Sequence, residues 1–269
     1  MRINTNINGM IATNQMAKNT ALAGNSMEKL STGLRITKAG DDAAGLAVSE
    51  KMRAQIRGME QAERNVQDGI SMVQTAEGAL EEAGNIAQRM RELAIQAGND
   101  TLSGEDRTKI ETEIDQLQEE MSSIATETKF NGNTLLDGNN QNFTIQSGAN
   151  DEVREITMEN LSDIAGTLSG LDLSSNGGAQ SAIGDIDKAL ESINEARSNL
   201  GAMQNRLEYT ATNLTTSTEN LSAAESRIRD VDVAKEMVKL SKLNILNQAS
   251  QAMVSQAKQQ PESVTQLLR

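Results

Sequence analysis

The sequence predicts a mainly α protein, a long antiparallel helical bundle or coiled coil that carries a small β-hairpin element. Apolar residues recur at steps of three and four along two stretches of about 50 residues each, which is typical of long amphipathic helices. A turn-rich stretch with alternating residues lies between them and predicts the hairpin. Since the chain has one Tyr, two Phe and no Trp among 269 residues, its core must consist of Leu, Ile, Val, Met and Ala.

The first long helix, of about 50 residues, is predicted to end near Ala97, with its apolar positions running from Met52 to Ala97. Its apolar positions follow the helical repeat without interruption, and Gly98 stands where a helix commonly ends. Asp41 or Asp42 can cap its start, because a short acidic side chain accepts hydrogen bonds from the free N–H groups of the first turn. The stretch "LSTGLRITKAGDDAAGLAVSEKM" before it holds three glycines and marks a boundary.

Two further helices complete the predicted bundle. Ser103 with Asp106 resembles a capping box, and apolar residues from Ile110 to Ile124 follow it. The other pattern runs from Ile183 to Val231 and is as long as the first. Three helices with seams of this spacing can form a bundle.

The segment between the second and third helices has the pattern of a β element at about residues 130–165. Asn131-Gly132 and Asp137-Gly138 are turn signals, and "NFTIQ" and "VREITM" alternate as strands do. We expect a hairpin packed on the bundle. The stretch "GTLSGLDLSSNGGAQS", residues 166–181, is predicted to be a loop that leads to the third helix.

The two ends of the chain have weaker apolar seams, diluted with Asn, Thr, Ser and Gly. Such seams offer too little apolar surface to hold an isolated helix pair, so we expect both ends to become ordered only when a partner covers them. The sequence thus predicts a self-folding helical domain at residues 41–230 between two partner-dependent segments, 1–40 and 231–269.

Composition and charge exclude several classes of function. The chain lacks His and Cys, which removes the usual general base, thiol nucleophiles and most zinc sites, so we expect no enzyme. The net charge of −13 argues against nucleic-acid binding. No apolar run is long enough to cross a bilayer, and the N-terminus lacks the apolar region of a secretory signal. These signals alone would place the protein in the cytosol.

Several motifs resemble those of bacterial flagellin, the filament protein of the flagellum. They are "MRINTNI", "LSTGLRI", "AGDDAAGLAVSEKMRAQIRG", "AEGAL", "FNG" followed by "LLDG", "GAMQNRLE" and "QAKQQPESVTQLL". The resemblance covers roughly residues 1–138 and 186–269 and includes only the inner part of longer flagellins, without their variable outer domains.

The resemblance implies a structural subunit that polymerises into the flagellar filament, with its two ends paired at the filament axis. It further implies export by the flagellar type III system, hence an extracellular location without a cleaved signal. The expected partners are other copies of the chain, an export chaperone at the C-terminal segment, and the filament cap and hook-associated proteins. Two alternatives are a hook-filament junction protein of related architecture and a non-flagellar helical adaptor.

The residues expected to pack along the filament axis are the larger apolar positions of the two ends. They should be buried by neighbouring subunits, since ordering the ends costs conformational entropy that apolar burial must offset. They are Ile3, Ile7, Met10, Leu34, Val238, Ile245 and Val254.

A second candidate site is a receptor-recognition patch. "QRMRELAIQ" resembles the segment by which a vertebrate Toll-like receptor detects many flagellins, and the matching positions are Arg89, Leu93 and, on the next helix, Glu113. Periodicity alone favours a different interpretation, in which Leu93 packs in the helical seam and the two charges are solvated.

No cofactor or metal site is expected. The adjacent carboxylates of Asp41 and Asp42 could suggest a metal, but such a pair before a helix more often caps it.

Overall fold

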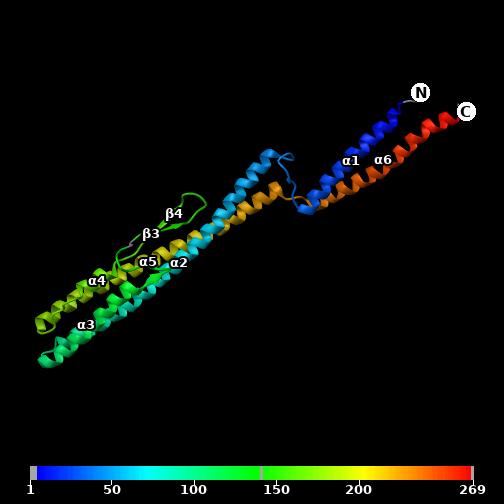
Figure 1. The fold of residues 1–269 in the computed structure, drawn as a ribbon. Helices are drawn as coiled ribbons and strands as arrows, with labels where there is room; N and C mark the ends of the chain where they lie inside the picture. Colours follow the sequence, from blue (N-terminus) through cyan, green and yellow to red (C-terminus); the bar gives the residue numbers. More distant parts are fainter. Residues whose placement is uncertain (1–4, 140–141, 268–269) are drawn as a thin grey trace. The chain divides into compact units, whose positions relative to one another are not determined.

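The computed structural model describes residues 5–139 and 142–267, with side chains up to residue 259 (Figure 1). They fall into two compact units, Met1–Ala54 with Asn220–Arg269, and Gln55–Glu219. The helices are α1 (Ile7–Thr32), α2 (Ala43–Ala97), α3 (Gly104–Glu127), α4 (Leu161–Thr167), α5 (Asn176–Arg229) and α6 (Val233–Leu267), and the strands are β1 (Lys129–Phe130), β2 (Asn133–Thr134), β3 (Asn142–Gln146) and β4 (Val153–Thr157).

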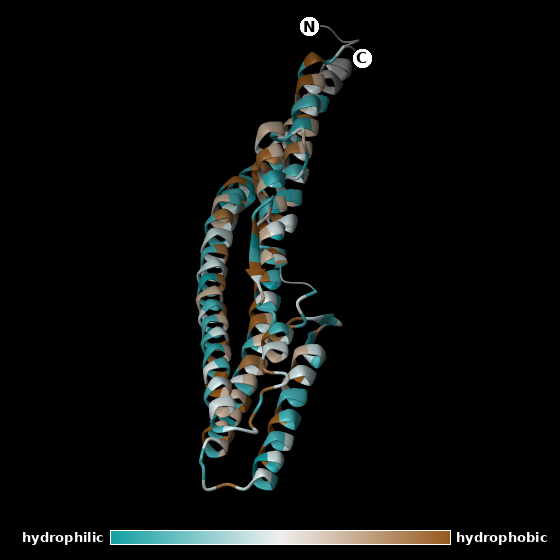
Figure 2. Cartoon of the chain, turned by 90° about the vertical axis from the view of Figure 1, so that its left-hand side faces the viewer, coloured by the Kyte–Doolittle hydropathy of each residue, from teal (hydrophilic) through white to brown (hydrophobic). Residues whose placement is uncertain are grey.

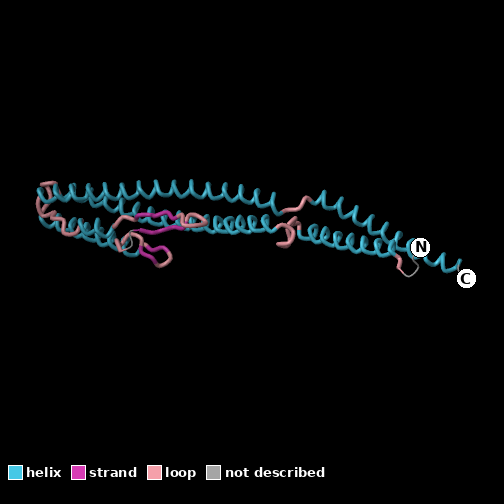
Figure 3. Tube along the Cα trace, turned by 90° about the horizontal axis from the view of Figure 1, so that it is seen from above, coloured by secondary structure: helices cyan, strands magenta, loops and turns pink. Residues whose placement is uncertain are grey.

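The unit Gln55–Glu219 is built on α2 and α5, which run antiparallel. Side-chain bonds join them at intervals in one constant register: Arg91 to Asp187 at 2.6 Å, Arg197 to Glu81 at 3.8 Å, and Thr215 to Glu63 at 3.1 Å. Between these bonds the apolar stripes of both helices are buried, as their helical periodicity predicts. The long helices and the short strands beside them are seen in Figure 3. The predicted fold class is confirmed.

The helix starts follow the predicted caps. Asp42 caps α2, since its Oδ1 accepts a hydrogen bond from the N–H of Gly45 at 2.9 Å. Ser103 and Asp106 form the predicted capping box of α3, each accepting a hydrogen bond from the other's backbone N–H. These short polar side chains satisfy donors that no helical carbonyl can reach.

The predicted hairpin is formed by β3 and β4, which pair antiparallel from Asn142↔Thr157 to Gln146↔Val153. It packs on α2 at Gly69, where a Cβ would overlap the Cδ1 of Ile145. Asn65 of α2 also donates to the carbonyl of Gln146 at 3.2 Å. A glycine in the middle of α2 therefore creates the space that the hairpin occupies.

The predicted turn at Asn131-Gly132 joins β1 to β2. Both residues have positive φ, 51° and 86°, as a two-residue hairpin turn of this kind requires.

The predicted loop over residues 166–181 is only partly correct. Residues 166–167 are the last of the short helix α4, which the sequence pattern does not predict, and α5 already begins at Asn176. Ser175 explains this early start, because its Oγ accepts from the N–H of Gly178 at 3.1 Å and its carbonyl accepts from the N–H of Ala179 at 2.9 Å. The cap outweighs the two glycines that follow it, and the loop is confined to residues 168–175.

The other unit contains the terminal helices α1 and α6. They lie side by side and antiparallel, so the two chain ends lie at the same end of the pair (Figure 1). At the opposite end, the segments that follow α1 and precede α6 are joined by a bridge between Leu34 and Asp230. Two backbone hydrogen bonds hold it: Arg35 N–H to the Arg229 carbonyl at 2.6 Å, and Val231 N–H to the Gly33 carbonyl at 2.9 Å.

The expectations that residues 1–40 and 231–269 form separate domain segments, and that they order on polymerisation, stay predictions. In the single chain α1 and α6 are helical. Of the residues that the structure describes, no helix is long and apolar enough to cross a membrane.

Candidate functional site

The seam between α1 and α6 is polar. The buried side chains of α1 are Asn19 and Ser26, which are 4% and 1% exposed. On the α6 side the buried residues are Glu236, Leu243 and Ala257. This seam buries little apolar surface, so it stabilises the pair weakly.

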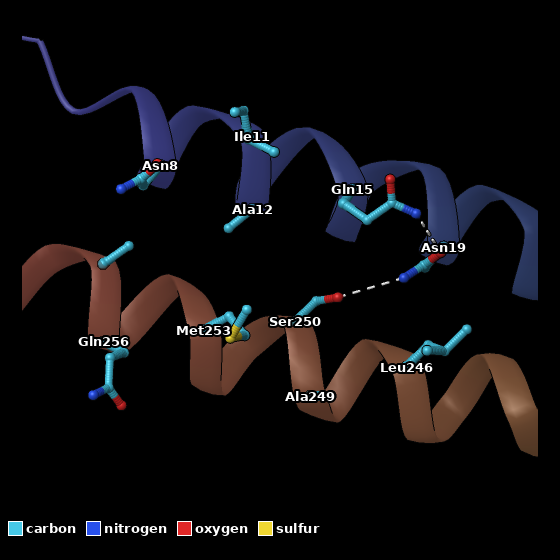
Figure 4. A pocket seen from close by; sticks show the side chains of 11 residues that line it. Asn8, Ile11, Ala12, Gln15, Asn19, Leu246, Ala249, Ser250, Met253 and Gln256 are labelled. Carbon is cyan, nitrogen blue, oxygen red and sulfur yellow. Dashed lines mark hydrogen bonds between the residues drawn. The ribbon is translucent and has the colours of Figure 1, made fainter.

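Hydrogen bonds cross this polar seam. Asn19 Nδ2 donates to Ser250 Oγ at 3.4 Å across the seam, while Asn19 Oδ1 accepts from Gln15 Nε2 of the same helix at 3.3 Å, as Figure 4 shows. Asn6 Nδ2 donates to the carbonyl of Ala257 at 2.6 Å. Buried polar side chains of this kind specify how two helices align more than they stabilise the pair.

Glu236 lies at the other end of the seam and is 8% exposed. The neighbouring Ser26 hydroxyl and the Lys239 ammonium, 3.0 Å from its Oε1, lower the pKa of Glu236 although burial acts to raise it. The carboxylate is therefore ionised at neutral pH and attracted to the basic side chain next to it.

Large apolar side chains of the terminal pair are exposed, and three of them, Ile11, Leu246 and Met253, line a hollow between the two helices. Among the side chains that the structure describes, eleven of the fifteen exposed large apolar ones belong to α1 and α6, and brown segments recur along both helices in Figure 2. We call these eleven the outer apolar face: Ile7, Met10, Ile11, Leu22, Met27, Val233, Met237, Val238, Ile245, Leu246 and Met253.

Hollows run along this surface. One has a volume of about 590 Å³ and lies between the two helices, lined by Ile11 and Ala12 of α1 and by Leu246, Ala249 and Met253 of α6 among others (Figure 4). A second, of about 370 Å³, lies on α6 beside Val238 and Ile245. An apolar surface of this extent is typical of an interaction site.

The predicted axial residues belong in part to this face. Ile7, Met10, Val238 and Ile245 are 49%, 59%, 72% and 63% exposed, so none of them packs in the seam of its own chain. Leu34 and Val254 are half-buried, Leu34 at the bridge to Asp230. Ile3 lies outside the described residues.

Sequence reasoning missed the polar seam and part of the outer apolar face. The weak apolar repeat of the two chain ends does not include four exposed residues of this face, Ile11, Leu22, Met237 and Met253. A search for polar residues at helical spacing would have found Asn19 and Ser26, which lie seven positions apart.

The predicted receptor patch is partly exposed. Arg89 of α2 pairs with Glu113 of α3 at 2.9 Å and with Glu92 at 3.2 Å, and these partners raise the pKa of the Arg89 guanidinium. Leu93 is only 3% exposed, and its side chain packs inside the unit. The two charges are accessible on the surface, whereas Leu93 is not.

The two adjacent carboxylates have structural partners. Asp42 caps α2, and Asp41 Oδ2 accepts hydrogen bonds from the N–H and hydroxyl of Thr37, at 3.2 Å and 3.0 Å, which lower the pKa of Asp41. Both carboxylates thus shape the segment before α2.

A helical chain with a polar internal seam and an outer apolar face has the features of a self-associating structural protein. Comparison with known proteins agrees: residues 3–141 match the bacterial flagellin N-terminal helical region, and residues 183–268 match the C-terminal helical region. The chain belongs to the bacterial flagellin family.

Individual relatives are similar over their whole length. The flagellin of Halalkalibacterium halodurans is 55% identical over 272 aligned residues, and the flagellin of Bacillus subtilis is 46% identical over 306, each with 100% of both chains covered. The crystal structure of Bacillus cereus flagellin is 34% identical with a TM-score of 0.52, and the match covers 60% of this chain and 94% of that one.

Proposed function

We propose that this chain is a structural subunit that polymerises into the bacterial flagellar filament. The observation that carries the proposal is the outer apolar face of the terminal pair, in a chain that matches flagellins along its whole length. Burying a Leu, Ile, Val or Met side chain stabilises an assembly by about 1.5–3 kcal/mol. Eleven such side chains can offset the entropy lost when subunits associate.

The assembly is an open filament of identical subunits. Contacts between two different faces of the same protein continue without limit when the rotation between subunits does not close a ring. The outer apolar face would pack against neighbouring copies and so form the inner part of the filament. Copies of the chain are thus its main partner.

The two alternatives differ from this proposal in what they assemble. A helical adaptor would form finite complexes, and a hook-filament junction protein would not elongate a filament indefinitely. The full-length similarity to two flagellins favours the filament subunit.

Removal of residues 231–269 tests the proposal. The variant lacks α6 and six of the eleven residues of the outer apolar face, so we expect it to remain soluble and unable to elongate filament seeds. The buried core of Gln55–Glu219 should still unfold cooperatively. Electron microscopy of seeds mixed with purified chain measures growth. Seeds that grow with the truncated chain, or that fail to grow with the full chain, would refute the proposal.

Export through a narrow channel to the outside of the cell is the second part of the proposal. A chain without cysteine and with three aromatic residues is easy to unfold and thread. An export chaperone would cover the exposed apolar residues of α6 before assembly, and the filament cap and hook-associated proteins would act at the growing end. If so, the purified chaperone should slow seed elongation by the full chain and leave a Val238→Asp, Ile245→Asp variant unbound. Equal binding of the variant would contradict this part.

The third part is recognition by the vertebrate receptor through Arg89 and Glu113. Both are exposed and lie on neighbouring helices, whereas Leu93 is buried. Arg89→Asp should weaken reporter-cell activation by the monomer with an unchanged circular dichroism spectrum, because interface arginines often dominate binding. Leu93→Ala should instead lower the free energy of unfolding. Full activation by folded Arg89→Asp would exclude this role.

A further inference from the structure

The only proline of the chain lies inside a helix. Pro261 belongs to α6, which continues to Leu267. Proline has no backbone N–H, so the carbonyl four residues earlier loses its helical hydrogen bond. That carbonyl belongs to Ala257, which is 9% exposed. A carbonyl that is both unpaired and shielded from water destabilises the fold unless another donor reaches it.

The donor that reaches it is the side chain of Asn6. Its Nδ2 lies 2.6 Å from the Ala257 oxygen. The other side-chain atom of Asn6, Oδ1, accepts from the N–H of Gly9 at 2.9 Å, and its carbonyl accepts from the N–H of Met10 at 3.0 Å. One asparagine therefore caps the start of α1 and completes the hydrogen bonding of α6.

The remaining hydrogen bonds across the seam are long. Asn19 to Ser250 and Thr20 to Asn247 both measure 3.4 Å, and the buried residues of α1 are small and polar. The backbone bridge that precedes α6 fixes the alignment at that end of the pair, but towards the chain ends such contacts could be exchanged for similar ones by a local shift of α6 along α1. The Ala257 carbonyl differs from them, since Pro261 leaves this one position of α6 without its donor.

We propose that Asn6 and Pro261 form a register lock, in which the proline creates an acceptor at one point of α6 and the asparagine satisfies it in one alignment only. The lock holds the alignment of the outer apolar face at the end of the pair that the bridge does not hold, where Ile11 and Met253 line the same hollow. This inference rests on the proposed function in one respect, that the aligned face is what neighbouring copies bind.

Asn6→Asp separates the two roles of the asparagine. Aspartate keeps the acceptor that caps α1 and adds a negative charge that favours a helix start, but it cannot donate to Ala257. We expect seed elongation to slow about tenfold, as for the loss of one buried hydrogen bond. Asn14→Asp is the control, with the same charge change at an exposed position of α1 that does not line the hollow between the helices, and should elongate like the unmodified chain.

Pro261→Ala supplies the missing N–H within the helix. In that background Asn6→Asp should have little effect, because Ala257 no longer needs a donor from α1, and the four chains form a double-mutant cycle. Equal slowing by Asn6→Asp with and without Pro261, or no slowing with Pro261, would overturn the lock.

The alignment of α1 and α6 can be measured without filament growth. Since the chain has no cysteine, Thr20→Cys with Asn247→Cys gives one defined disulfide whose yield reports the register in the full-length monomer. Asn6→Asp should lower this yield, and so should Pro261→Ala, because either change removes one half of the lock; an unchanged yield in both variants would contradict the lock. If unmodified chains fail to elongate seeds, the proposed function fails, while the disulfide yield still decides the lock.

Discussion

The two units of the chain place polar and apolar side chains in opposite ways. Among the side chains that the structure describes, Gln55–Glu219 buries 37 apolar residues and one polar one, Ser147, whereas the unit with the chain ends buries three apolar and four polar residues. The first unit can fold around its own core. The second unit exposes the apolar surface that a fold would normally bury, which is typical of an interaction site.

Charge divides the chain in the same way. The unit Gln55–Glu219 holds 11 basic and 29 acidic side chains, a net charge of −18, while the remainder holds 14 and 9, a net charge of +5. Like charges on neighbouring copies repel, and the terminal unit has the smaller net charge of the two. The region proposed to pack against other copies thus also carries the weaker repulsion.

Truncating one large apolar side chain in each unit tests the comparison. Leu80 is fully buried, so Leu80→Ala should lower the free energy of unfolding by about 2–5 kcal/mol. Ile245→Ala should change the stability of the monomer by less than about 0.5 kcal/mol, because this side chain is exposed. Chemical denaturation followed by circular dichroism measures both. Equal losses would mean that the terminal pair has a conventional core.

The hairpin of the first unit offers a smaller test. Gly69→Ala places a methyl group against Ile145 and should cost about 1–3 kcal/mol, the usual cost of overpacking. Gly78→Ala in the same helix is the control, since the added methyl group meets no other side chain or packed segment within 4 Å, and it should stabilise by up to about 1 kcal/mol. A neutral Gly69→Ala would show that the hairpin does not depend on the close contact with α2.

The smallest expected effect is the pH dependence of the terminal pair, which depends on the ionisation of Glu236. The pKa of Glu236 lies below its ordinary value of 4.5 in the folded pair, so its contribution to stability is present above pH 4.5 and is lost as the pH falls through the lowered pKa. Filaments of the unmodified chain should therefore weaken below pH 4.5 more than filaments of Glu236→Gln. Sedimentation measures the fraction of each chain that remains in filaments as the pH falls. The same pH dependence for both chains would show that Glu236 does not stabilise the pair.

Strong local patterns made much of the fold predictable. The stripe from Met52 to Ala97, the capping box at Ser103 and the hairpin strands each follow from one short-range rule, and each is present. The start of α5 was missed because Gly177 and Gly178 resemble a loop, while the Ser175 cap and burial of Ala179 favour a helix. The seven residues of α4 are too few to show a period.

The candidate site was harder to predict, because polar side chains are buried between its two helices and large apolar side chains are exposed. A search for apolar seams assumes that apolar residues face the partner helix, but Asn19 and Ser26 do so here. The apolar character of Ile7, Met10, Val238 and Ile245 indicated burial, and the sequence could not distinguish burial within the chain from burial between chains. The contact between Asn6 and Ala257 joins residues 251 positions apart and leaves no local signal.

The most direct test of the account is the accessibility of the outer apolar face before and after assembly. Val238→Cys introduces the only thiol of the chain at a side chain that is 72% exposed. The account predicts rapid labelling by a maleimide in the monomer and strong protection in filaments grown from seeds. Equal labelling rates in monomer and filament would contradict the claim that neighbouring copies cover this face.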